Sequence, residues 1–103
     1  MCASMDYLLY VGTAIYTGKP STNIYVGRLD ASAGKVTPLE SATESVNPGT
    51  LAIDPTGAYM FVANADSDNV VIFRINPHTG CLHPTGEVFN AKAPTCVTFL
   101  PVD

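Results

Sequence analysis

The sequence predicts an all-β chain made of two similar four-stranded antiparallel sheets. First, apolar segments rich in aromatic and β-branched residues alternate with short runs of Gly, Pro, Asn and Asp, which form turns. Second, the apolar segments lack a regular inside–outside alternation, which indicates sheets that are covered on both faces. Third, the second half of the chain repeats the first at a spacing of 46 residues, a period typical of repeated small sheets.

The clearest element is a hairpin in the middle of the chain. Asp54 to Gly57 is a turn, because proline fixes φ early in it and glycine accepts a positive φ at its end. Two apolar strands follow, Tyr59 to Ala63 and Val70 to Ile75, and the polar residues Asn64 to Asn69 form the loop between them. Strands covered on both faces are expected where small sheets stack, as the blades of a β-propeller do.

The remaining strands follow from the same signals. They are Tyr7 to Thr13, Ile24 to Leu29, Val36 to Ala42, Thr50 to Ile53, Leu82 to Phe89 and Thr95 to Leu100. Residues 1–103 then form one unit of two blades, the first from 7–42 with 95–100 added and the second from 50–90. The C-terminal strand is expected to complete the N-terminal blade, because joining the chain ends in one sheet removes exposed edges.

The internal repeat supports this division. Arg28 falls on Arg74 and Gly34 falls on Gly80 at the spacing of 46 residues. The segment Tyr7 to Tyr10 matches Tyr59 to Val62 at a spacing of 52, which places six extra residues in the loop Ala14 to Thr22. Each half therefore predicts one blade.

Composition favours contact with further protein surface. Hydrophobic residues make up 47% of the 103 residues, charged residues only 14%, and the mean hydropathy is +0.20. A small chain with so much apolar surface is expected to bury part of it against another chain. The net charge of −4 and the scattered basic residues argue against nucleic acid and membrane surfaces as partners.

The cysteines predict neither a disulfide framework nor a metal site. Cys2, Cys81 and Cys96 are odd in number and have no C-x-x-C spacing. No cofactor motif accompanies them, because the glycines form no phosphate-binding pattern before a helix. We expect no metal and no cofactor, and a cytoplasmic location with reduced thiols.

The repeated blocks resemble the lactonase family of seven-bladed β-propellers, the family of 6-phosphogluconolactonase. YVGTAIYTGKPSTNIYVGRLDASAGKVTPL at Tyr10 to Leu39 is similar to its opening blade. LAIDPTGAYMFVANADSDNVVIFRINPHTGCLHPTGEV at Leu51 to Val88, with PTCVTFLP at Pro94 to Pro101, is similar to its closing blade. The resemblance implies a blade fold and a lactone hydrolase, but the residues of the five middle blades have no counterpart here.

The resemblance also bears on assembly, since two blades alone leave two apolar faces uncovered. Self-association would give four blades in a dimer, six in a trimer and eight in a tetramer. We expect the trimer, because a blade shaped for a ring of seven should fit six more easily than four. A tetramer is the next alternative.

Candidate site residues lie in the loops expected at the axial mouth of the propeller. Hydrolysis of a sugar lactone needs a base, donors for the developing oxyanion, and cations for a phosphorylated substrate. The candidates are Glu44 and Asp66 as catalytic carboxylates, with Lys19 and Lys92 as cations and Asn47 and Asn64 as donors for substrate binding.

Simpler interpretations exist for several of these residues. Asp66 and Asp68 are typical turn formers in a hairpin loop, and Glu44 and Lys19 are typical of solvated surface. The sequence therefore leaves three hypotheses open. They are a sugar-lactone hydrolase whose site forms at the oligomer axis, a non-catalytic propeller scaffold or binding module, and a fragment or engineered reduction of a longer lactonase.

Overall fold

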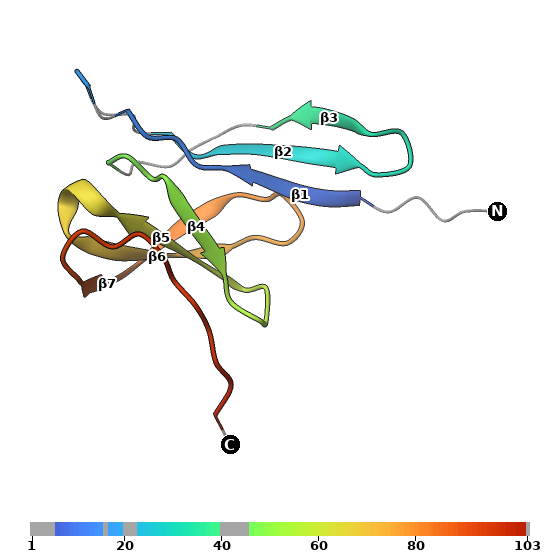
Figure 1. Ribbon diagram of the computed structural model, residues 1–103. Helices are drawn as coiled ribbons and strands as arrows, with labels where there is room; N and C mark the ends of the chain where they lie inside the picture. The colour runs from blue at the N-terminus through green and yellow to red at the C-terminus, as the bar shows by residue number, and fades with distance from the viewer. Residues whose placement is uncertain (1–5, 16, 20–22, 40–45, 103) are drawn as a thin grey trace.

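Each half of the chain folds into its own antiparallel sheet in the computed structural model, which describes residues 6–15, 17–19, 23–39 and 46–102. In chain order the elements are β1 (Asp6–Val11), β2 (Tyr25–Asp30), β3 (Lys35–Pro38), β4 (Thr50–Ile53), β5 (Tyr59–Asn64), the 3-10 helix η1 (Ala65–Ser67), β6 (Asn69–Ile75) and β7 (Leu82–Asn90). The sheet β1–β3 lies over one face of the sheet β4–β7 (Figure 1). The predicted all-β class with two antiparallel sheets is confirmed.

The first sheet has the order β1-β2-β3, with β2 in the centre. Tyr10 lies opposite Val26 and Leu8 opposite Arg28, so these side chains share one face of the sheet. β3 ends at Pro38, and the Leu39 N–H still donates to the Val26 carbonyl at 2.9 Å. The rest of the predicted strand Val36 to Ala42 lies outside the described residues.

The second sheet has the order β4-β5-β6-β7 and matches the predicted second blade. β4 has the predicted bounds, and β5, β6 and β7 each extend the prediction by one residue, to Asn64, Asn69 and Asn90. The loop between β5 and β6 contains η1, which the sequence did not predict. The pairing of β6 with β7 is irregular between Val71 and Phe73, where the intervening carbonyl of Ile72 accepts from the Thr85 hydroxyl at 2.9 Å.

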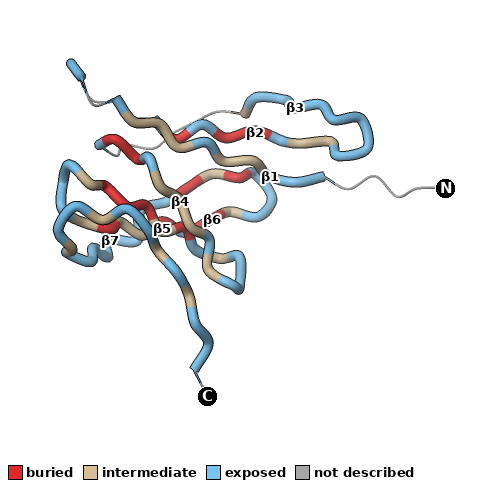
Figure 2. Tube along the Cα trace, viewed as in Figure 1, coloured by how far each residue is buried: buried red, intermediate tan, exposed pale blue. Residues whose placement is uncertain are grey.

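The core lies between the two sheets, where Figure 2 shows most of the buried residues. Side chains of both sheets contribute to one cluster, with Tyr10, Leu51 and Val71 packed against it: Ile24, Met60, Val62, Phe73, Ile75 and Leu82. The Tyr10 hydroxyl donates to the Gly80 carbonyl at 2.8 Å and ties β1 to the turn between β6 and β7. Among the described residues, the first sheet thus stacks on the second through apolar contacts and this tyrosine hydrogen bond.

Strand pairing corrects the predicted alignment of the two halves by one residue. Arg28 lies opposite Leu8, and its repeat partner Arg74 lies opposite Tyr59. Leu8 therefore corresponds to Tyr59 at a spacing of 51, not 52, and the loop before β2 carries five extra residues, not six. Because side chains alternate along a strand, this single residue decides which face of the sheet each side chain occupies.

The prediction that Thr95 to Leu100 completes the first sheet is wrong for this structure. Residues 94–102 form no strand, and β1 pairs with β2 alone among the described elements. The segment instead follows the second sheet on the side away from β1 and continues away from both sheets (Figure 1). The second sheet lies between the segment and the edge of β1, so the described chain ends do not meet in one sheet.

Candidate functional site

Asn47 joins two of the loops in which the sequence placed candidate site residues. Its side-chain nitrogen donates to the Ile15 carbonyl at 3.0 Å and to a carboxylate oxygen of Asp66. Its side-chain oxygen accepts from the Ile15 N–H at 3.0 Å. Asn47 is 3% exposed and has a φ of 48°, a left-handed conformation that Asn tolerates better than most residues. The buried amide therefore holds the loop after β1 against η1.

Asp66 is the candidate carboxylate that this arrangement orients. It lies on η1, is exposed, and accepts a hydrogen bond from Asn47. Because the Asn47 amide is fixed by Ile15, the Asp66 side chain is anchored by a residue that cannot easily rotate. The structure thus brings together two predicted site residues, Asp66 and Asn47.

Asn64 and Asp68 organise the same hairpin loop. Asn64 is 2% exposed, and its amide donates to the Asn69 side-chain oxygen at 3.2 Å. Asp68 has a φ of 54°, and its carboxylate accepts from the Ala93 N–H at 2.9 Å, while its carbonyl accepts from the Ala91 N–H at 3.1 Å. Asp68 therefore fixes the loop after β7 on both sides of Lys92, a role that sequence reasoning missed.

The predicted cations, unlike Asn47, are not in contact with Asp66 among the described residues. Lys19 and Lys92 are exposed, and within the described ranges neither makes an ion pair with Asp66. Glu44 lies outside the described residues. Of the predicted site residues that the structure describes, Asp66 and Asn47 are thus in contact, and the two lysines lie on other loops.

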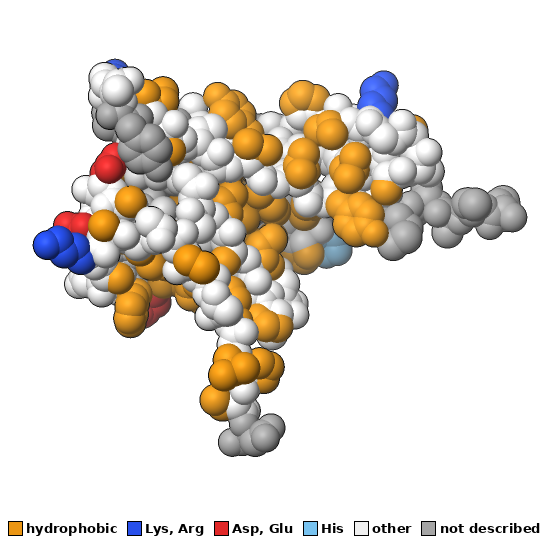
Figure 3. Space-filling view, in the orientation of Figure 1, with side chains coloured by type: hydrophobic (Ala, Val, Ile, Leu, Met, Phe, Trp, Pro, Cys, Tyr) orange, Lys and Arg blue, Asp and Glu red, His pale blue; other side chains and the backbone are white. Residues whose placement is uncertain are grey.

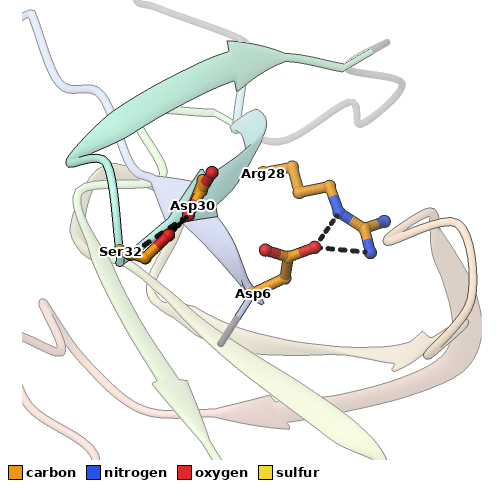
Figure 4. A network of polar contacts seen from close by, with 4 residues as sticks. All are labelled: Asp6, Arg28, Asp30 and Ser32. Carbon is orange, nitrogen blue, oxygen red and sulfur yellow. Dashed lines mark hydrogen bonds and ion pairs between the residues drawn. The ribbon is translucent and has the colours of Figure 1, made fainter. Parts of the chain in front are cut away.

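Arg28 on β2, one of the two arginines related by the repeat, forms an ion pair with Asp6. The Arg28 guanidinium contacts the Asp6 carboxylate at 3.2 Å through two nitrogens, beside the turn in which Asp30 accepts from Ser32 (Figure 4). The side chains of Arg28 and Asp6 are 53% and 41% exposed, so the pair contributes little to stability. The guanidinium is thus paired with Asp6 rather than available to a phosphate group.

Two half-buried aspartates act as turn formers. The Ser32 hydroxyl and the N–H groups of Ser32 and Ala33 donate to Asp30 and hold the pKa of its carboxyl below the usual value. The Thr56 hydroxyl has the same effect on the pKa of Asp54, assisted by the Tyr59 N–H. Both carboxylates are satisfied by their own turns.

Histidines do not enter the candidate site. His78 lies in the turn between β6 and β7, where its N–H donates to the Asn76 side-chain oxygen at 2.9 Å. His83 lies on β7 opposite Arg74, at the end of the sheet remote from η1. Neither is placed to act as a base near Asp66.

The described residues contain no group of three or more His, Cys, Asp or Glu side chains that could hold a metal ion. Across the same residues, no helix has the length and apolar character needed to span a bilayer.

Comparisons with known proteins agree with the stacked sheets. Residues 40–99 match the profile of the family described as Lactonase, 7-bladed beta-propeller. No curated protein matches the chain at a significant level. Among solved structures, a candidate 6-phosphogluconolactonase from Bacteroides fragilis superposes with a TM-score of 0.79 at 22% identity, covering 91% of this chain and 25% of its own.

Two further structures are similar to the chain. A candidate 6-phosphogluconolactonase from Bacteroides uniformis gives a TM-score of 0.78 at 22% identity, over 90% of this chain and 26% of its own. The periplasmic gluconolactonase of Pseudomonas aeruginosa gives 0.74 at 19% identity, over 99% of this chain and 30% of its own. The chain thus spans between a quarter and a third of the length of these proteins. With more than half of its residues matched by the family profile and its two sheets superposing on these folds, the chain belongs to the lactonase family of seven-bladed β-propellers.

Proposed function

We propose that the chain supplies the blades of a sugar-lactone hydrolase whose site lies at the mouth of an assembled propeller, with Asp66 as the general base. The observation that carries the proposal is the exposed Asp66 carboxylate, held by the buried amide of Asn47. Membership of the lactonase family supports the reaction class. The names of the similar solved structures suggest a gluconolactone or its 6-phosphate as substrate.

The proposed reaction is the addition of water to the lactone carbonyl. Asp66 takes a proton from water while the water oxygen attacks the carbonyl carbon. The ring carbon–oxygen bond then breaks, and the released ring oxygen takes the proton from Asp66 to become a hydroxyl, which leaves a sugar acid and restores the Asp66 carboxylate. Lys19 and Lys92 would bind an anionic group of the substrate from the loops on either side.

A non-catalytic scaffold or binding module is the second candidate. The amides predicted to bind substrate serve the loops instead, since Asn47 bonds to Ile15 and Asp66, and Asn64 bonds to Asn69. The net charge of −4 also disfavours a phosphorylated ligand. A fragment or engineered reduction of a longer lactonase, and a cytoplasmic location, stay predictions.

The test is the ring opening of 6-phosphogluconolactone, measured against the spontaneous reaction. We expect catalysis by the wild-type chain, and a loss of about 100-fold or more in Asp66→Asn, because removal of a general base typically costs about 10²–10⁴ in rate. Lys19→Ala and Lys92→Ala should raise KM for the phosphorylated lactone.

Asp68→Asn is the matched control. It removes the same charge from the same loop, and its side-chain oxygen can still accept from the Ala93 N–H, so its rate should stay within a few-fold of wild type. A wild-type rate equal to the spontaneous one would favour the scaffold. Equal losses in Asp66→Asn and Asp68→Asn would show that Asp66 acts through charge or loop structure, not as the base.

A further inference from the structure

Two apolar faces remain open on opposite sides of the stacked sheets. The first open face belongs to β1–β3 and contains Leu9, Val11, Tyr25, Val36 and Pro38. The second open face belongs to β5–β7 and contains Tyr59, Phe61, Ile72 and Phe89. Val11 is 45%, Tyr25 52% and Phe89 67% exposed. Figure 3 shows hydrophobic side chains on the surface of the first sheet and along the C-terminal segment.

The second open face is equivalent, in the repeat, to the surface through which β1 and β2 pack on the second sheet of the same chain. At the spacings fixed by strand pairing, Tyr10 corresponds to Phe61 and Val26 to Ile72. Tyr10 and Val26 pack toward the second sheet, whereas Phe61 and Ile72 line a hollow on its outer surface. The second sheet thus presents outward the same surface that the first sheet buries.

The surface on which β1 and β2 pack, around Gly80, is also repeated in the chain. Inside the chain, Leu8 and Val26 close over Gly80, where a Cβ atom would lie 2.9 Å from Leu8 Cδ2 and 3.2 Å from Val26 Cγ1. Its repeat partner Gly34 has a similar backbone, with φ of 66° against 78°, but no atom lies within 4 Å of its Cβ position. Gly34 therefore offers an equivalent flat surface, and none of the described residues packs on it.

The C-terminal segment is positioned as the first strand of a following sheet. β4 packs against the end of β1, where Leu51 Cγ lies 3.3 Å from a Cβ built at Gly12. The C-terminal segment lies in the equivalent place against β5: the rings of Phe99 and Phe61 are 5.0 Å apart, and the Thr95 carbonyl accepts from the Thr50 hydroxyl at 3.3 Å. None of the described strands pairs with it.

We propose that copies of this chain assemble head to tail, with the second open face of one copy on the first open face of the next. Thr95 to Leu100 of the first copy then adds to the edge of β1 in the second. Transferring the β4–β5 register places Val97 opposite Val11 and Phe99 opposite Leu9. Val97 and Phe99 would then face their own second sheet, as Phe99 already does.

The two open faces are unlike each other, so this contact is heterologous and generates a closed ring when its rotation permits. Each copy donates one strand and receives one, which completes every sheet with four strands. A single chain cannot do this, because its second sheet separates the C-terminal segment from β1 (Figure 1). The strand that was predicted to close the chain on itself is therefore assigned to the neighbouring copy.

Disulfide trapping between two differently substituted chains tests the assignment. In a background with Cys2, Cys81 and Cys96 replaced by Ser, one chain carries Val11→Cys and the other carries Val97→Cys. The two are refolded together and oxidised, because residues directly opposite in an antiparallel pair are close enough for a disulfide. We expect a covalent product of two chains that forms only in the mixture.

Val36→Cys replaces Val11→Cys in the matched control. Val36 lies on the same open face and is equally exposed, at 46% against 45%, but it lies on β3, far from the receiving edge. We expect the Val11 mixture to give at least a tenfold higher yield. Equal yields, the absence of product, or a disulfide within single chains carrying both Val11→Cys and Val97→Cys would each overturn the proposal. The outcome is independent of lactone hydrolysis, since an assembled ring without activity would contradict only the proposed function.

Discussion

Gly80→Ala measures how closely the first sheet packs on the second. The added methyl group would meet Leu8 and Val26 of the first sheet at 2.9 and 3.2 Å. Leu8 can move its side-chain end, but Val26 is only 5% exposed and β-branched, so part of the overlap must be taken up by the sheets. Overpacking of this kind costs about 1–3 kcal/mol, in addition to about 1 kcal/mol for a non-glycine residue at positive φ.

Gly57→Ala separates these two contributions. Gly57 has a φ of 77°, against 78° at Gly80, but no atom lies within 4 Å of its Cβ position. In urea unfolding followed by circular dichroism, we expect Gly57→Ala to lower the free energy of unfolding by about 1 kcal/mol and Gly80→Ala by about 2–4 kcal/mol. Equal losses in the two variants would refute the close contact of the first sheet with Gly80.

Three further predictions concern the core, the link between the sheets and the turns. Met60→Ala, at a residue that is 0% exposed, should lower the free energy of unfolding by about 2–5 kcal/mol in the same urea assay, and a loss below 1 kcal/mol would contradict its place in the core. Tyr10→Phe removes the hydrogen bond to Gly80 and should cost about 1 kcal/mol, whereas Tyr25→Phe, at a residue that is 52% exposed, should cost less than about 0.5 kcal/mol. Asp54 has a lowered pKa, so its contribution to stability is present above the pKa of the unfolded carboxyl and is lost as the pH falls through the folded value. In an NMR titration the Asp54 carboxyl should therefore have a midpoint below 3.8, and a midpoint at or above 3.8 would contradict the turn geometry.

The sequence was informative wherever a strand finds its partner nearby in the chain. β4 to β7 were predicted within one residue, because turn residues mark both ends of each strand. The alignment of β1 with β5 was one residue out, because the run Tyr7 to Tyr10 is apolar at every position and lacks the alternation that would fix its register. Only the pairing of Leu8 with Arg28 settles that register.

The eighth strand shows what local sequence cannot determine. Thr95 to Leu100 has the composition of a strand, but a strand also needs an edge to pair with, and β1 lies beyond the second sheet. Composition predicts that the segment can form a strand, but it does not predict which strand will pair with it. The structure therefore shows it packed through Phe99 but unpaired.

The candidate site was predicted as a set of loops but not as a set of contacts. Asn47 and Asp66 were both placed near the mouth, yet the hydrogen bonds that fix the Asn47 amide to Ile15 depend on how the two halves stack. Asp68 was interpreted only as a turn former, although its carboxylate also fixes Ala93. The sequence signal shared by both loops is the residue directly before a proline, Asn47 in one loop and Ala93 in the other. Both residues have a positive φ, and they occupy equivalent positions of the repeat.

The mass of the 103-residue chain in solution tests most directly whether its two sheets are a unit that requires neighbours. Native mass spectrometry and sedimentation should find a closed species of three chains of 10.9 kDa each, or of four, whose population falls when residues 95–103 are deleted. A well-folded species of one chain at all concentrations, with its open faces exposed to water, would contradict the account.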